Sequence, residues 1–300
     1  MNTRQPLDGR AVGLMLVLCL LWALQQIGLK ATAHDFSPVL QIALRSAVAA
    51  VLVRLYMAAS GERMDLSRRI WPPGLVIGLL FALEYLLVGE GLRRTSAAHI
   101  VVFLYTAPIF AALGLHWKLP SEKLAPLQWL GIGLAFAGIA VAFVLRDGST
   151  PQGDMAQVVL GDVLGLLGGL AWGATTVVIR ATPLSGLSAS QTLLYQLLGA
   201  FALLLPGAFA LGQTTFHPSA LVLAEFAFQC FIVSFASFLV WFWLLRHYLA
   251  SRLGVFSFLT PLLGVVLGAW LLGEHIAPAF VVGAGMVLAG IVLVGRKQGS

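Results

Sequence analysis

Several polar and aromatic side chains stand deep inside long apolar runs, and these are the residues of the sequence that could do chemistry. Glu84 is followed by Tyr85 in one such run, and Gln25 and Gln26 interrupt another. A carboxylate can bind an ammonium group or take up a proton, and an amide can hydrogen-bond a carboxylate or an amine. Aromatic rings can stack on apolar groups or attract a cation. This combination suits a small molecule that has both polar and apolar parts.

The midpoints of the apolar runs predict which of these side chains share one depth. The predicted solute-binding residues are Trp22, Gln25, Gln26, Glu84, Tyr85, Tyr105, Trp172, Thr176, Phe238 and Ser257. Glu84 is the most informative of them, because a carboxylate in apolar surroundings must be protonated, paired or exposed to water. It could contact an ammonium group, exchange a proton, or act as a neutral acid bonded to another helix. Arg45 is the deep basic residue and a candidate partner for it.

The sequence lacks the residue spacings that enzymes and nucleotide-driven pumps need. It has no His-Glu-x-x-His, Gly-x-Ser-x-Gly or Cys-x-x-Cys pattern and no phosphate-binding loop. Cys19 and Cys230 stand singly in apolar runs, so neither a disulfide nor a metal site is expected, and no cofactor. The net charge of +6 is not gathered in any basic run longer than a pair, so nucleic acid is not an expected partner.

Composition predicts the elements that position these residues. The 300 residues are 59% hydrophobic and 10% charged, whereas charged residues make up about a quarter of a soluble domain. A helix needs roughly 20 apolar residues to cross a bilayer. We therefore expect an all-α integral membrane protein with ten transmembrane helices in the lipid bilayer. The expected spans are 11–32, 37–58, 71–92, 96–118, 124–145, 159–181, 188–211, 220–245, 251–272 and 277–295.

Depth within a span separates the tryptophans into two groups. Tryptophan commonly anchors a helix at the membrane interface, which explains Trp71, Trp117 and Trp270. Trp22 and Trp172 stand well inside their spans, so they could face a cavity or fill the packing between the halves. Glu90, His99, Asp162 and Glu225 lie near span ends and suit solvated or capping roles, and Glu122 and Glu274 suit the first turns of the fifth and tenth helices.

An internal duplication divides the chain. The stretch from Ala97 to Ile139 matches the stretch from Ala250 to Ile291, with Pro108 on Pro261 and, after a slip of one residue, several glycines in register. We predict two five-helix units, residues 1–150 and 151–300. Pro108 and Pro261 remove a backbone hydrogen bond inside a span, so they could be hinges for gating or static kinks that shape a cavity.

Basic residues predict the orientation. Lys30, Arg93, Arg94 and Arg146 would face one side, and the other basic residues outside the spans would face the cytoplasm together with both termini. Because each unit has an odd number of spans, the two units would cross the membrane in opposite senses. Such inverted repeats are typical of secondary transporters, with the solute site at mid-depth between them.

The duplicated unit, the mid-helix prolines, the Gly273-Glu274 turn and the glycine-rich fifth and tenth spans together resemble the drug/metabolite transporter superfamily in its EamA branch. The segment Tyr105-Thr106-Ala107-Pro108, with Trp22, Trp172 and Trp241, is similar to YddG-type exporters of aromatic amino acids. This resemblance implies a ten-helix basket around a central cavity, with the fifth and tenth spans packed at its side.

The expected function follows from these points. We expect a secondary transporter, not an enzyme, that exports small amphipathic metabolites by alternating access across a bacterial-type cytoplasmic membrane. Amino acids, including aromatic ones, are the expected solutes. A drug or another metabolite as the solute, or a passive channel, is the alternative. The coupling ion and the oligomeric state stay open, and a monomer is compatible with the sequence.

Overall fold

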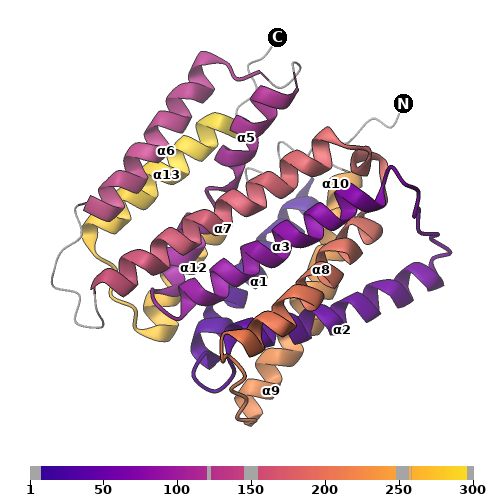
Figure 1. Ribbon diagram of the computed structural model, residues 1–300. Helices are drawn as coiled ribbons and strands as arrows, with labels where there is room; N and C mark the ends of the chain where they lie inside the picture. The colour runs from indigo at the N-terminus through magenta and orange to yellow at the C-terminus, as the bar shows by residue number, and fades with distance from the viewer. Residues whose placement is uncertain (1–7, 120–122, 145–154, 248–256, 258, 296–300) are drawn as a thin grey trace.

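The computed structural model describes residues 8–119, 123–144, 155–247, 257 and 259–295 (Figure 1). Apart from one isolated bridge between Phe36 and Phe216, the regular structure of these residues is helical. The helices are α1 (Gly9–Thr32), α2 (Pro38–Ala59), α3 (Trp71–Leu92), α4 (Ala97–Leu104), α5 (Ala107–Lys118), α6 (Pro126–Val144), α7 (Met155–Ala181), the short 3₁₀ helix η2 (Pro183–Gly186), α8 (Ala189–Ala210), α9 (Ala220–Ala227), the π-helix η3 (Phe228–Ser237), α10 (Phe238–His247), α12 (Leu259–Leu272) and α13 (Pro278–Gly295).

Seven of these segments are long and apolar enough to cross a membrane, when α4 and α5 are taken together and α9 is taken with η3 and the start of α10. Shorter apolar helices occur in α6, α12 and α13. Large apolar side chains such as Val51, Leu55 and Leu75 are exposed, as is usual where helices face lipid. The chain is therefore a multi-span membrane protein, and the number of ten spans stays a prediction.

Local sequence fixes several helix ends. Asp8, Ser96, Ser188 and Ser219 each accept a hydrogen bond from the backbone N–H three residues later, so they cap α1, α4, α8 and α9. One of these caps starts α1, which carries Trp22, Gln25 and Gln26, and another starts α4, which ends just before Tyr105.

Two of the long segments change their helical form partway through. The fourth expected span is broken at Tyr105 and Thr106, between α4 and α5, because Pro108 has no N–H to donate to the carbonyl oxygen of Leu104 and its ring crowds that carbonyl group. In the eighth expected span, η3 interrupts the α-helix over Phe228–Ser237. Such π-helical stretches occur frequently at functional sites.

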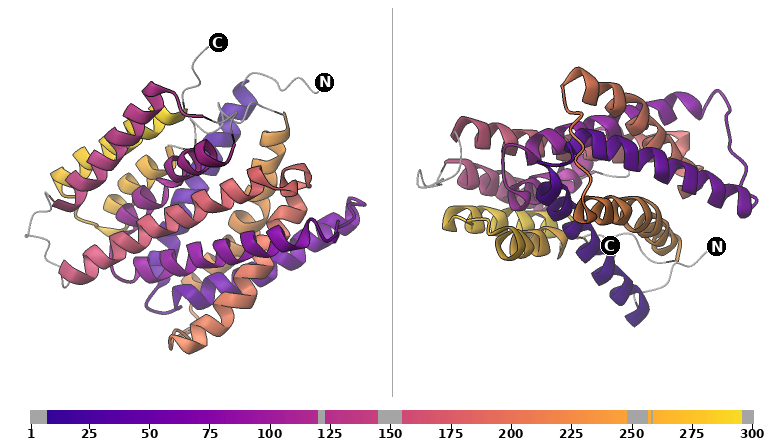
Figure 2. Two further views of the ribbon diagram at one scale, coloured as in Figure 1. Left: turned by 45° about the horizontal axis from the view of Figure 1, so that its top comes forward. Right: turned by 90° about the horizontal axis from the view of Figure 1, so that it is seen from below.

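Helix pairs from distant parts of the sequence lie side by side. In both Figure 1 and Figure 2, α6 and α13 run together at one edge of the molecule. Elsewhere α3 packs between α7 and α8, α1 packs on α12, and α2 packs on α8 and η3. The α3–α8 contact needs glycine on both sides, because a Cβ atom on Gly78 would lie 2.8 Å from the carbonyl oxygen of Tyr195.

The helix ends gather on two faces. We call one the Lys30 face: here the loop before α2 pairs with the loop before α9, through Ser37 N donating to Thr215 O at 3.0 Å. We call the other the Arg10 face: here Asp65, in the loop after α2, accepts a hydrogen bond through its carbonyl oxygen from Gln191 Nε2 at 2.7 Å. Helices α1 and α2 each run from one face to the other.

Candidate functional site

Three helices bring several predicted polar residues together with a buried arginine. Gln25 and Gln26 of α1 are 5% and 3% exposed, and Glu84 and Tyr85 of α3 are each 5% exposed. Gln25 Nε2 donates a hydrogen bond to the Tyr85 hydroxyl at 3.4 Å. The Arg45 guanidinium of α2 lies over the Tyr85 ring, 4.6 Å from its centroid. Tyr85 therefore contacts the buried Arg45, and Gln25 is linked to it through the Tyr85 hydroxyl.

The buried arginine belongs to a larger polar network that the sequence analysis missed in part. Arg45 Nη1 donates to Gln229 Oε1 of η3. Gln229 Nε2 donates to Glu225 Oε1 at 2.6 Å and to the Gln25 carbonyl oxygen at 3.0 Å. The Glu225 carboxylate also accepts from Gln41 Nε2 of α2. We call Gln41, Arg45, Glu225 and Gln229 the α2–η3 network.

The solvated or capping role expected for Glu225 is wrong, because this residue is only 9% exposed and its carboxylate accepts two amide hydrogen bonds. A signal for the network was present in the sequence. Gln41 with Arg45, and Glu225 with Gln229, are polar pairs spaced four residues apart within apolar runs, a spacing that puts both members on one face of a helix.

Glu84 differs from Glu225. Among the residues that the structure describes, its carboxylate makes neither a hydrogen bond nor an ion pair, although it lies within range of Coulombic attraction to Arg45. The direct partnership expected between Glu84 and Arg45 is thus replaced by an attraction at longer range. Gln26 Oε1 and Arg45 Nε are also buried without a partner among the described residues.

The aromatic residues form two edge-to-face pairs next to this cluster. Tyr105 lies at the break between α4 and α5, and its ring meets the Trp172 ring of α7 at 5.2 Å between centroids and 88°. Trp22 of α1 meets Trp241 of α10 at 5.5 Å and 77°, and its Nε1 donates to Ser237 Oγ at 3.1 Å. Tyr105 is within electrostatic range of Glu84, so the first pair adjoins the polar residues.

The remaining predicted residues are less closely tied to the cluster. Thr176 Oγ1 donates to the Trp172 carbonyl oxygen of its own helix at 3.3 Å. Phe238 is half-buried at the start of α10 and packs against the core, and Ser257 is half-buried in a helical conformation. Pro108 is half-buried in the first turn of α5, and Pro261 is buried in the first turn of α12. Their assignment to binding and hinge roles stays a prediction.

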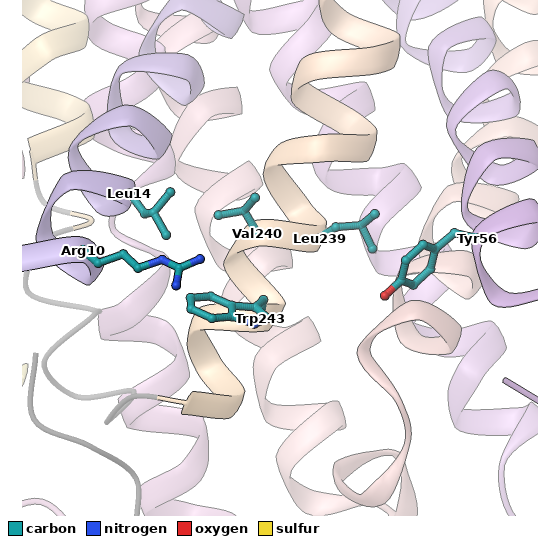
Figure 3. Close-up of a pocket in the computed structure, with 6 residues that line it drawn as sticks. All are labelled: Arg10, Leu14, Tyr56, Leu239, Val240 and Trp243. Carbon is teal, nitrogen blue, oxygen red and sulfur yellow. The ribbon is translucent and has the colours of Figure 1, made fainter. Parts of the chain in front are cut away.

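A pocket of about 370 Å³ opens at the Arg10 face between α1, α2 and α10 (Figure 3). Arg10 reaches over the Trp243 ring at 5.0 Å from its centroid, and Tyr56 stands on the opposite wall. Leu14, Leu239 and Val240 complete the lining. This pocket is not lined by the mid-depth residues, so the expected central cavity stays a prediction.

The Lys30 face is tied by charged side chains that join distant helices. Lys30 Nζ donates to the carbonyl oxygens of Leu92 at 2.5 Å and Thr95 at 2.8 Å. Glu274, in the loop between α12 and α13, accepts from the backbone N–H groups of Ala97 at 2.6 Å and Ala98 at 3.1 Å. Glu274 therefore caps the start of α4, and not the first turn of the tenth span as expected. Its counterpart Glu122 lies outside the described residues.

A second group at this face is also buried against expectation. Asp162 of α7 has no exposed surface, and His99 of α4 is 9% exposed. Asp162 Oδ1 accepts from Thr95 Oγ1 at 2.6 Å and lies 3.0 Å from His99 Nδ1. The His99 ring stacks on Phe280 of α13 at 3.9 Å between centroids. The solvated or capping role expected for these two residues is wrong.

Comparisons with known proteins found a family model and several transporters that resemble this chain. The EamA-like transporter family matches residues 9–144 and 159–296. The uncharacterized transporter YoaV of Bacillus subtilis is 23% identical, with 91% of this chain and 92% of YoaV covered. The uncharacterized inner membrane transporter YedA of Escherichia coli is 23% identical over 94% of this chain and 89% of YedA.

Two further similarities are informative. A protein of Salmonella typhimurium named a probable amino-acid metabolite efflux pump is 24% identical, with 93% of each chain covered. A solved crystal structure, 21% identical, covers 95% of both chains with a TM-score of 0.66, which shows a shared fold. The match of the family over both parts of the sequence, together with the membrane-spanning helices, leads to one conclusion: the chain belongs to the EamA-like transporter family and is a membrane transporter.

Proposed function

We propose that the protein exports small amphipathic metabolites, above all amino acids including aromatic ones, across a bacterial cytoplasmic membrane by alternating access. The observation that carries this proposal is the set of buried polar residues Arg45, Glu84 and Gln26, of which Glu84 lies within electrostatic range of Tyr105 in the Tyr105–Trp172 pair. Charged and amide groups suit a polar head group, and the rings suit an aromatic side chain. The similarity to an amino-acid metabolite efflux pump points in the same direction.

Helix packing supports two inverted units, residues 1–150 and 151–300, in this proposal. If the two units are exchanged, the contact of α1 with α12 becomes the contact of α7 with α4 and α5, and both contacts are present. Likewise, the contact of α2 with η3 becomes the contact of α8 with α3. A twofold axis in the membrane plane that relates the two units requires that their helix contacts exchange in this way.

The two faces support alternating access. Glu274 and Lys30 tie the Lys30 face, whereas the pocket opens at the Arg10 face. Both termini and the Arg10 face would lie in the cytoplasm according to the distribution of basic residues. The state seen here would then be closed toward the outside, and export would require the Lys30 face to open.

The test is transport by the purified protein in liposomes. We expect saturable exchange of labelled phenylalanine, and we expect Trp172→Ala and Tyr105→Ala each to slow it several-fold, since an aromatic pair contributes about 0.5–1.5 kcal/mol. Trp270→Ala is the matched control, because Trp270 is 77% exposed and far from the pair in the sequence, and it should leave the rate unchanged. Absence of flux for any amino acid would overturn the assigned solute class, and flux that does not saturate would favour a passive channel.

A further inference from the structure

Arg45 is a buried cation with unused hydrogen-bonding capacity. It is 2% exposed, and among the described residues its Nε donor has no acceptor. A buried donor without an acceptor costs free energy, so buried polar groups in native proteins nearly always have a partner. Within the described residues, Arg45 also makes no ion pair with a carboxylate. Its charge is thus available to an anion that enters the cluster.

Among the described residues, the neighbours of Arg45 hold its guanidinium in place without forming an ion pair with it. The Tyr85 ring covers one side of Arg45, and the side-chain amide oxygen Oε1 of Gln229 accepts from Nη1. Gln229 is fixed in turn by its hydrogen bonds to Glu225 and to the Gln25 backbone. Glu225 is already engaged by two amides, so it fixes Gln229 and does not bind Arg45 directly.

Two hydrogen-bond acceptors on neighbouring helices also lack a partner, as Arg45 Nε does. Glu84 precedes Tyr85 on α3 and lies in Coulombic range of Arg45, and its carboxylate has no hydrogen-bond partner among the described residues. Gln26 Oε1 on α1 is likewise buried and unpartnered in the part of the chain described. One cation, one carboxylate and one amide oxygen from adjacent helices are therefore all short of partners.

This set matches a solute that carries a carboxylate and an ammonium group together. We propose that Arg45 and Glu84 form a zwitterion subsite in which Arg45 binds the carboxylate of the solute and Glu84 binds its ammonium group. The Gln26 oxygen accepts a further N–H of that ammonium group. The inference rests on the proposed function and narrows the solute class. An amine without a carboxylate would leave Arg45 without an anion to bind, and an acid without an amine would leave Glu84 without a cation to bind.

The position of the aromatic pair agrees with this subsite. Tyr105 lies within electrostatic range of both Glu84 and Tyr85. Its ring contacts Trp172 on the side of α7. A solute whose head group lies between Arg45 and Glu84 would extend its side chain toward Tyr105 and Trp172. Arg45 is then a specificity-determining residue on α2, and the other members of the α2–η3 network position it.

The test uses the wild-type protein in liposomes with three unlabelled competitors against labelled phenylalanine. Phenylalanine has both charged groups, 2-phenylethylamine lacks the carboxylate, and 3-phenylpropionate lacks the ammonium group. We expect each single-charge analogue to compete roughly tenfold or more weakly than phenylalanine, as the loss of one charge-assisted contact requires. Equal competition by 2-phenylethylamine would overturn the subsite while leaving amino-acid export intact.

Variants assign the carboxylate contact to Arg45 itself. Arg45→Gln should weaken competition by phenylalanine roughly tenfold while competition by 2-phenylethylamine stays unchanged, so discrimination between them is lost. Arg54→Gln is the matched control, because Arg54 lies on the same helix but is exposed. Unchanged discrimination in a folded Arg45→Gln protein would overturn the assignment. Absence of any phenylalanine flux in the wild-type protein would instead overturn the proposed function on which the subsite rests.

Discussion

At the scale of single residues, Glu225 shows how a buried charge can serve structure and site together. Its carboxylate accepts hydrogen bonds from Gln41 and Gln229, which belong to α2 and η3. These contacts hold η3 against α2 at the level of Arg45. A carboxyl group can accept a hydrogen bond on each of its two oxygens, so one side chain can fix two amides in the apolar surroundings.

Replacement of this acid should therefore destabilise the protein. Glu225→Ala leaves one amide N–H of Gln41 and one of Gln229 without an acceptor, and each buried donor without a partner costs about 1–3 kcal/mol. We expect a clearly lower midpoint of thermal unfolding in detergent than for Leu221→Ala, a control on the same helix whose side chain is 67% exposed. Equal midpoints for the two variants would show that the α2–η3 network contributes nothing to stability.

The sequence predicted the members of the aromatic pairs better than the polar network. Tyr105 and Trp172 stand at mid-depth in their runs, and their rings are in contact, whereas Trp22 pairs with Trp241 instead. Gln41 and Gln229 were missed because their roles depend on which face of α2 meets η3, and a π-helix shifts the faces that a regular α-helix would present. Burial of Asp162 and Glu225 was missed for a related reason, since distance from a span end does not show what covers a side chain.

At the scale of elements, the link between Glu274 and α4 joins the two parts of the chain. The α12–α13 loop supplies the carboxylate, which accepts hydrogen bonds from the first backbone N–H groups of α4, where the helix dipole favours a negative charge. Ser96 caps the same helix end. Opening of the Lys30 face would require this contact to break.

Removal of the carboxylate should loosen the start of α4. Glu274→Ala removes two acceptor contacts worth about 1–2 kcal/mol together, which corresponds to a factor of roughly 5–30 in a local opening equilibrium. Hydrogen exchange of the amides at Ala97 and Ala98 should accelerate by that factor. The neighbouring variant His275→Ala should leave the exchange unchanged, because His275 is exposed. Exchange that is equally slow in both variants would mean that Glu274 does not hold α4.

The helix boundaries themselves were largely predictable. Apolar runs bounded by charged residues, proline and glycine located α1, α2 and α3 within a few residues of their observed ends. The break after Leu104 follows from Pro108, and the sequence pointed to it. The long π-helix from Phe228 to Ser237 had no comparable signal, because no proline or glycine marks it and its residues are ordinary for an apolar span.

At the scale of the whole molecule, buried polar residues lie between two faces of different construction. The Lys30 face is tied by side chains from several helices, the Arg10 face has the pocket, and Gln26 and Glu84 are buried between the two faces. The proposed transport cycle exposes the same buried residues to one face at a time. A passive channel would expose them to both faces at once.

Cysteine accessibility measures this difference directly. The chain has only two cysteines, so Gln26→Cys can be made with Cys19→Ala and Cys230→Ala and placed in oriented liposomes. A membrane-impermeant thiol reagent added to one side at a time should label it from the Arg10 face alone, and saturating phenylalanine should slow the labelling. Added Glu274→Ala should permit labelling from the Lys30 face as well. Labelling from both faces at equal rates without that substitution, and without protection by any amino acid, would contradict the account.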